Sequence, residues 1–163
     1  MCPRRRMKSM PEEYINTRLK EPSDQNNSLK TFEQHILLVE DEPDVALVTK
    51  TRLELEGFKV FTVNEGSEVL SYIDKVSPDL MLLDLKMSRL DGYSVYKQMK
   101  SDKRTKDIPI ILFSDSSDCL RQYRDVLEAH RQLELSVDDI ISKPYETKTL
   151  LKKIKKLIKV KRF

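Results

Sequence analysis

Three carboxylate residues stand where short apolar segments end. Residues 36–39 read ILLV and run directly into Glu40 and Asp41, and residues 80–83 read LMLL and run into Asp84. Carboxylates held close together repel one another, which is unfavourable unless a cation compensates the charge. An open site of carboxylate oxygens suits Mg²⁺, which keeps several of its own waters. These residues therefore predict a magnesium site, provided that the fold brings the segment ends together.

Two further polar residues follow later apolar segments. Ser114 ends the segment that begins IPIILF, and Lys143 follows a short segment around Ile140. A hydroxyl group and an ammonium group would then join the three carboxylates if all of these segments are strands of one sheet. Taken singly, each residue also has an ordinary interpretation: a solvated strand end, a helix cap or a surface lysine.

The segments that carry these residues alternate between two patterns. HILLV, KVFTV, DLMLL, IPIILF and a short fifth segment are branched and aliphatic, as is typical of buried parallel strands. Amphipathic segments lie between them, including one over residues 45–55 with Leu47, Val48 and Leu55 among its apolar residues, a longer one over 120–133 and a last one over 150–158. Five strands alternating with five helices predict a doubly wound α/β fold. Ligands of such sheets bind at the carboxyl ends of the strands.

Composition and charge bound the remaining possibilities. A chain of 163 residues suits one domain, which we place at 35–163, after a polar and aperiodic N-terminal extension at 1–34. Cys2 and Cys119 belong to no metal-binding pair, and we expect them to be reduced thiols. There is no apolar run long enough to span a bilayer and no secretory signal at the start, so we expect no membrane association and a cytoplasmic protein.

The order of these motifs resembles the receiver domain of two-component response regulators, which has a flavodoxin-like fold. The matching pieces are the acid pair in VEDE, Asp84 in LLDLKM with Asp91 and Gly92 behind it, Ser114 in ILFSD, and Lys143–Pro144 in DDIISKPY. The resemblance covers about residues 35–160. Any one of these motifs is weak, but four of them at successive strand ends, in this order, are specific.

The resemblance implies a role for each residue. Asp84 would accept a phosphoryl group from a sensor histidine kinase and form an aspartyl phosphate. Lys143 would pair with Asp84 and then with the phosphoryl oxygens, and Ser114 would donate a hydrogen bond to the same group. Such a protein catalyses only its own phosphorylation and dephosphorylation and is not otherwise an enzyme. The implied Mg²⁺ ligands are the side chains of Glu40, Asp41 and Asp84 and the main-chain carbonyl of Lys86.

The sequence departs from the family pattern at several positions. Ser88 stands where a proline is usual, which predicts a looser loop beyond Asp84. Ile140 stands where a tyrosine or phenylalanine commonly changes rotamer on phosphorylation, and the stretch from residue 114 to residue 143 is longer than usual. Asp115 replaces a small residue. Its carboxylate either points into the site and slows the entry of anionic donors, or it caps the next helix or faces water.

We expect a stand-alone receiver, similar to chemotaxis response regulators. The resemblance implies that it signals by phosphorylation-dependent binding of a protein partner through its fourth-helix and fifth-helix face. The alternative within the family is a relay intermediate that passes the phosphoryl group to a histidine phosphotransfer protein. An aspartyl phosphatase is disfavoured because Lys86 stands where such enzymes carry the second acid of DxD.

The basic C-terminal end raises a further alternative. Residues 143–163 contain nine basic residues and one acidic residue, against 14 basic and 21 acidic residues over 35–142. The lysines occupy the polar face of a helical stripe, which is typical of a solvated surface or of a docking surface for an acidic protein. A nucleic-acid-binding module is less favoured, because the segment lacks interleaved aromatic residues and base-reading motifs.

Overall fold

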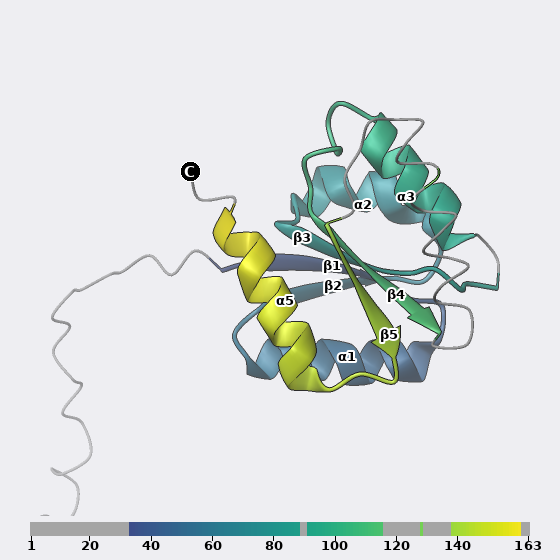
Figure 1. Cartoon of the computed structure of the whole chain (residues 1–163). Helices are drawn as coiled ribbons and strands as arrows, with labels where there is room; N and C mark the ends of the chain where they lie inside the picture. The colour runs from purple at the N-terminus through teal and green to yellow at the C-terminus, as the bar shows by residue number, and fades with distance from the viewer. Residues whose placement is uncertain (1–32, 89–90, 116–127, 129–137, 161–163) are drawn as a thin grey trace, which may run out of the picture. The chain divides into compact units, whose positions relative to one another are not determined.

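The computed structural model describes residues 33–88, 91–115, 128 and 138–160 (Figure 1). The elements follow one another as strand, helix, strand through most of this length. In chain order they are β1 (His35–Val39), α1 (Pro43–Leu55), β2 (Lys59–Val63), the short 3₁₀ helix η2 (Gly66–Glu68), α2 (Val69–Val76), β3 (Leu80–Asp84), α3 (Gly92–Ser101), β4 (Ile110–Asp115), β5 (Asp139–Lys143) and α5 (Thr147–Val160).

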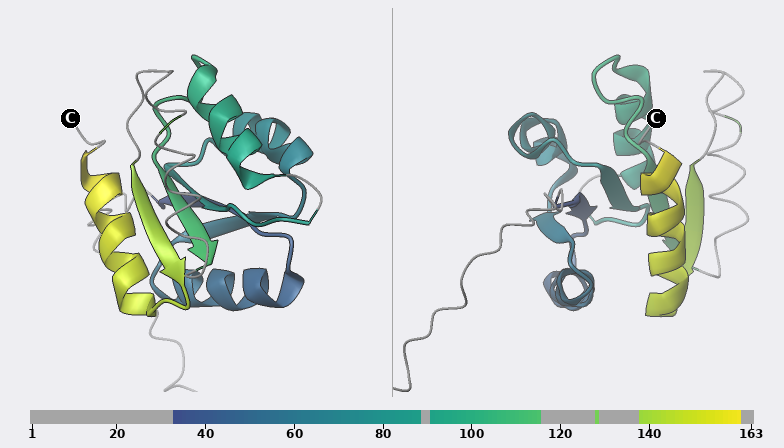
Figure 2. Two further views of the ribbon diagram at one scale, coloured as in Figure 1. Left: turned by 45° about the vertical axis from the view of Figure 1, so that its right-hand side comes forward. Right: turned by 90° about the vertical axis from the view of Figure 1, so that its left-hand side faces the viewer.

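The five strands form one parallel sheet in the order β2-β1-β3-β4-β5. Helices α1 and α5 cover one face, and α2 and α3 cover the other (Figures 1 and 2). Successive residues of β1 alternate between the two cores: Ile36 and Leu38 pack on the α1 and α5 side, Leu37 and Val39 on the α2 and α3 side. All four are fully buried, because a sheet covered on both faces needs apolar residues throughout.

This architecture confirms the predicted doubly wound, flavodoxin-like fold. All five predicted strands are present, and the helix at the C-terminal end buries Leu150, Leu151 and Ile154 as its apolar stripe requires. Four α-helices lie among the described residues. The helix predicted over 120–133 falls outside the described part of the chain, as do Cys2, Cys119 and nearly all of the predicted N-terminal extension, so the domain boundary at residue 35 stays a prediction.

One predicted helix has a different buried face. The predicted apolar residues of α1 included Leu53, which is buried, but also Leu47, Val48 and Leu55, which are all exposed, Leu55 by 83%. The buried residues of α1 are Ala46, Thr49 and Leu53. Their spacing of three and four residues is the helical period. Apart from Leu53, the stripe was therefore assigned to the wrong face, because alanine and threonine contribute little to a hydrophobic pattern.

Two contacts hold the start of α3 near the carboxyl edge of the sheet. Asp91 caps α3 by accepting a hydrogen bond from the Tyr93 amide at 3.1 Å. Gly92, the first residue of α3, lies so close to the β3 strand end that a Cβ there would stand 2.1 Å from the carbonyl oxygen of Asp84. Only glycine permits this approach, so the start of α3 lies directly against the end of β3. The Lys143–Pro144 peptide bond, at the end of β5, is cis.

No helix among the described residues has both the length and the apolar character needed to cross a membrane.

Candidate functional site

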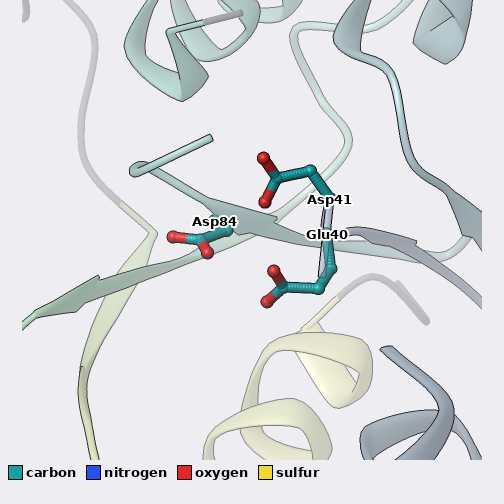
Figure 3. Close-up of side chains that lie close together, drawn as sticks. All are labelled: Glu40, Asp41 and Asp84. Carbon is teal, nitrogen blue, oxygen red and sulfur yellow. The ribbon is translucent and has the colours of Figure 1, made fainter. Parts of the chain in front are cut away.

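The three carboxylates predicted to form a site meet at the carboxyl edge of the sheet (Figure 3). Glu40 and Asp41 follow β1 and Asp84 ends β3, and these strands are hydrogen-bonded neighbours. One oxygen of each carboxylate lies within 4.8 Å of the others. Glu40 and Asp84 are 2% and 3% exposed, whereas Asp41 is partly exposed. The parallel sheet thus creates a compact acidic cluster from residues that are 44 positions apart or less.

Lys143, at the end of β5, supplies the cluster with an ammonium group. Its Nζ donates hydrogen bonds to Asp84 Oδ2 at 2.8 Å and to Glu40 Oε2 at 3.0 Å. Burial raises the pKa of Glu40, and the nearby Asp84 charge adds to this effect, while the Lys143 hydrogen bond opposes it. Burial alone would lower the pKa of Lys143, but the bonds and charges of Asp84 and Glu40 outweigh it and raise that pKa. One cation is therefore shared between two buried acids.

Asp41 takes its hydrogen bonds from the loop that follows β3. Both the backbone N–H and the hydroxyl of Ser88 donate to Asp41 Oδ2, at 2.6 Å and 2.7 Å. The backbone hydrogen bond is the main cause of the lowered pKa of Asp41. The looser loop expected beyond Asp84 stays a prediction, because residues 89–90 lie outside the described part of the chain. A proline in its place has neither donor, so the serine attaches the loop to the end of β1.

Ser114 lies in β4 one residue beyond Phe113, which pairs with Asp84 in the sheet. It is 1% exposed, and its Oγ is the single buried side-chain oxygen or nitrogen without a hydrogen-bond partner among the described residues. Buried hydroxyl groups nearly always have a partner, and leaving one unpaired is unfavourable. Such a group is suited to donate a hydrogen bond to a ligand oxygen.

Asp115 faces the same cleft and is paired. Its Oδ2 accepts a hydrogen bond from Lys86 Nζ at 2.9 Å, and this bond lowers the pKa of Asp115. The Lys86 amide, in turn, donates to Asp84 Oδ1 at 2.9 Å and fixes that carboxylate from the other side. Of the two predicted positions for Asp115, the structure thus supports the one facing the site. The predicted helix cap concerns residues after Asp115, which fall outside the described ranges.

The cleft around these groups is lined by carboxylates, hydroxyls and ammonium groups from four strand ends and their loops. Its lining includes Asp41, Asp84, Lys86, Ser88, Asp115 and Lys143. Hard oxygen ligands with excess negative charge are the donor set that Mg²⁺ prefers, so the residues present fit this ion. The role of the Lys86 main-chain carbonyl as a ligand stays a prediction.

Three contacts at the site were not anticipated from sequence. Ser88 binds Asp41, Lys143 binds Glu40 as well as Asp84, and Tyr145 stacks on Phe113 with ring centroids 5.0 Å apart. The one sequence signal for the tyrosine is its place two residues after Lys143. Ile140, at the family's aromatic position, is half-buried and packs on the α2 and α3 side of the sheet.

Comparison with known proteins agrees with this geometry. The family profile described as "Response regulator receiver domain" matches residues 36–155. Among curated proteins, the response regulator SaeR of Staphylococcus aureus is 35% identical over 124 residues, which are 76% of this chain and 50% of SaeR. The chain spans about half the length of the curated relatives it matches.

Solved structures give the same result. The signal receiver domain of a histidine kinase from Syntrophus aciditrophicus is 35% identical, with a TM-score of 0.67, over 80% of this chain and 94% of that one. A sensor histidine kinase receiver domain from Pseudomonas aeruginosa PAO1, solved with a magnesium ion in its active-site cleft, is 26% identical, with a TM-score of 0.67, over 78% of this chain and 98% of that one. From the matched profile, the relatives and the acidic cluster together, this chain belongs to the response regulator receiver domain family.

Proposed function

We propose that Asp84 is the phosphoacceptor of a two-component signalling pathway. One oxygen of its carboxylate attacks the phosphorus of a phosphohistidine on a sensor histidine kinase, the bond from phosphorus to the histidine nitrogen breaks, and an aspartyl phosphate forms. The observation that carries this proposal is the buried position of Asp84 between two fixed donors: its Oδ1 accepts from the Lys86 amide and its Oδ2 from the Lys143 ammonium. A nucleophile held in this way is positioned for in-line attack.

We further propose that Mg²⁺ is the cofactor of this reaction. Glu40, Asp41 and Asp84 would hold it with the main-chain carbonyl of Lys86. The ion would offset the negative charge of the transferring phosphoryl group. Phosphoryl transfer depends mainly on such charge compensation and on positioning. The cluster has three carboxylates and one ammonium group, that of Lys143, and this excess of negative charge supports the assignment.

Two residues of the chain would then respond to the phosphoryl group. Lys143 already contacts Asp84 and would pair with a phosphoryl oxygen, and Ser114 would donate its unused hydrogen bond to another. Movement of Ser114 toward that oxygen would draw the end of β4 inward and change the surface beyond it. The protein would thus be a phosphorylation-dependent switch that acts on no separate substrate.

The output of this switch is proposed to be the binding of a protein partner in the cytoplasm through the fourth-helix and fifth-helix face. Part of the charge on α5 is already compensated within the domain, because Lys153 pairs with Asp139 and Lys155 with Glu56. This pairing favours a solvated or protein-binding helix over a nucleic-acid-binding one. Transfer of the label from Asp84 to a histidine phosphotransfer protein would instead identify a relay intermediate.

The proposal is tested by labelling with acetyl phosphate in the presence of Mg²⁺, followed by intact mass measurement. We expect one added phosphoryl group that hydroxylamine removes, as it removes acyl phosphates, and none in Asp84→Asn. Asp74→Asn is the matched control, since Asp74 is an exposed aspartate away from the cleft. Labelling of Asp84→Asn to the wild-type extent would exclude Asp84 as the acceptor.

A further inference from the structure

Ser88 makes an unusually close double contact with one oxygen of the acidic cluster. Its amide and its hydroxyl donate to the same atom, Asp41 Oδ2, at 2.6 Å and 2.7 Å. Ordinary N–H···O bonds centre near 2.9–3.0 Å, and shorter ones are typical where the acceptor is ionised. Two strong donors are thus directed at one carboxylate oxygen.

This contact has a counterpart on the other side of the cluster. The Lys143 ammonium donates to Glu40 and Asp84, which are buried, whereas Asp41 is more exposed and receives its donors from Ser88. Every carboxylate of the cluster therefore has a hydrogen-bond donor supplied by the chain itself. For Asp41 that donor is neutral and lies on a loop, four residues after Asp84.

We propose that Ser88 is a latch on Asp41 that competes with Mg²⁺ for the Oδ2 oxygen and lowers the affinity of the site for Mg²⁺. The proposal rests on the proposed function, in that it takes the acidic cluster to be the magnesium site. Ser88 is a positioning residue in this account. It acts through Asp41 and does not contact the reacting atoms.

The physical reason is competition for the same oxygen. Mg²⁺ demands close to ideal octahedral geometry and approaches a carboxylate oxygen along a lone pair. An oxygen that already accepts two hydrogen bonds has both of its lone-pair directions in use. Binding of the ion through Asp41 Oδ2 must therefore displace or weaken at least one Ser88 bond, and the free energy of that bond is subtracted from the binding free energy.

The latch also links the metal to the loop that follows β3. Ser88 attaches its part of this loop to the end of β1, so an ion that displaces the contact also frees Ser88 from Asp41. By linkage, a substitution that frees the loop must favour the ion by the same factor. The Ser88 contact and the bound ion therefore oppose each other at Asp41.

The variants follow from the two donors. Ser88→Ala removes the hydroxyl and keeps the amide, and Ser88→Thr keeps both donors. Ser94→Ala is the matched control in the neighbouring helix, because Ser94 is exposed and its hydroxyl lies 3.5 Å from Asp91, a carboxylate outside the cluster. The probe is Mg²⁺ alone, titrated by calorimetry and by thermal melting at each metal concentration.

We expect Ser88→Ala to melt below the wild type without metal and to bind Mg²⁺ roughly tenfold more tightly, as expected for one hydrogen bond to a charged group. The difference in melting temperature between Ser88→Ala and the wild type should then be smaller at saturating Mg²⁺ than without it. Ser88→Thr and Ser94→Ala should keep the wild-type affinity.

Equal or weaker binding by Ser88→Ala, with wild-type Mg²⁺ binding intact, would overturn the latch and leave the proposed magnesium site standing. Absence of Mg²⁺ binding in the wild type would overturn both. Labelling of Asp84 by acetyl phosphate reports separately on the acceptor, so the failure of either proposal can be recognised on its own.

Discussion

Carboxylates lie at both edges of the five-stranded sheet, but they meet different partners there. At the amino-terminal edge, Asp79 accepts the amide of His35 at 2.9 Å. Asp138, which precedes β5, accepts the amide of Ile110 at 2.9 Å and the ammonium of Lys100 at 2.6 Å. Lys100 also donates to two backbone carbonyls. Each acid at this edge has donors of its own.

At the carboxyl edge the groups are not balanced. Glu40 and Asp84 share one ammonium, Asp41 depends on Ser88, and the buried hydroxyl of Ser114 has no partner among the described residues. Burying charge in this way costs stability unless a further group compensates it. The acids of the amino-terminal edge are thus paired within the chain, whereas those of the carboxyl edge carry an excess of negative charge, as the proposed cation and phosphoryl group would require. Local conflict of this kind is expected at functional sites.

The largest effect on stability is expected from Lys100→Met. The Lys100 side chain is 5% exposed, so its loss leaves Asp138 and two carbonyls without their charged donor. Breaking such a pair should lower the free energy of unfolding by about 3 kcal/mol, measured by urea denaturation. Lys97→Met, on the exposed face of the same helix, should change it by less than about 0.5 kcal/mol. Equal effects of the two substitutions would show that the amino-terminal edge is not a stabilising network.

Two buried hydroxyl groups give a closer comparison of the edges. Thr105, before β4, is 1% exposed and donates to the carbonyl of Met99 at 2.6 Å, whereas the equally buried Ser114 donates to no described residue. Thr105→Val should cost about 1 kcal/mol of unfolding free energy. Ser114→Ala, in the absence of metal and donor, should cost almost nothing. The distinction between the edges fails if Ser114→Ala is as destabilising as Thr105→Val.

The smallest expected effect concerns Asp115. Its carboxylate pairs with Lys86 at the mouth of the cleft, so Asp115→Asn should remove one negative charge near the entry path of an anionic donor. A unit charge a few ångströms away in water changes a rate by about threefold, and labelling by acetyl phosphate should accelerate by that factor. Lys86→Gln should slow it. An unchanged rate in both variants would remove the electrostatic role of this pair.

Much of the fold and site could be predicted because parallel strands place their carboxyl ends at one edge. This rule alone brought Glu40, Asp41 and Asp84 together, with Ser114 and Lys143 beside them. The contact of Ser88 with Asp41 could not be predicted, since a loop residue has no periodicity.

The face of α1 was also mispredicted, and for a related reason. The helix is apolar on more than one side, so hydrophobicity does not select the buried face. Packing against the sheet selects Ala46 and Thr49, which are small enough for close approach, over the larger Leu47 and Val48. The size of the side chains, which the apolar pattern does not encode, decided which face of α1 is buried.

The most direct test of the contrast between the edges is the gain in unfolding free energy when Mg²⁺ is added. For an ion that binds only the folded protein, the gain at 100 times Kd is about 2.7 kcal/mol. We predict this gain for the wild type and for Asp79→Asn at the amino-terminal edge, and a much smaller gain for Asp41→Ala at the carboxyl edge. An equal gain in the wild type and in Asp41→Ala would contradict the account.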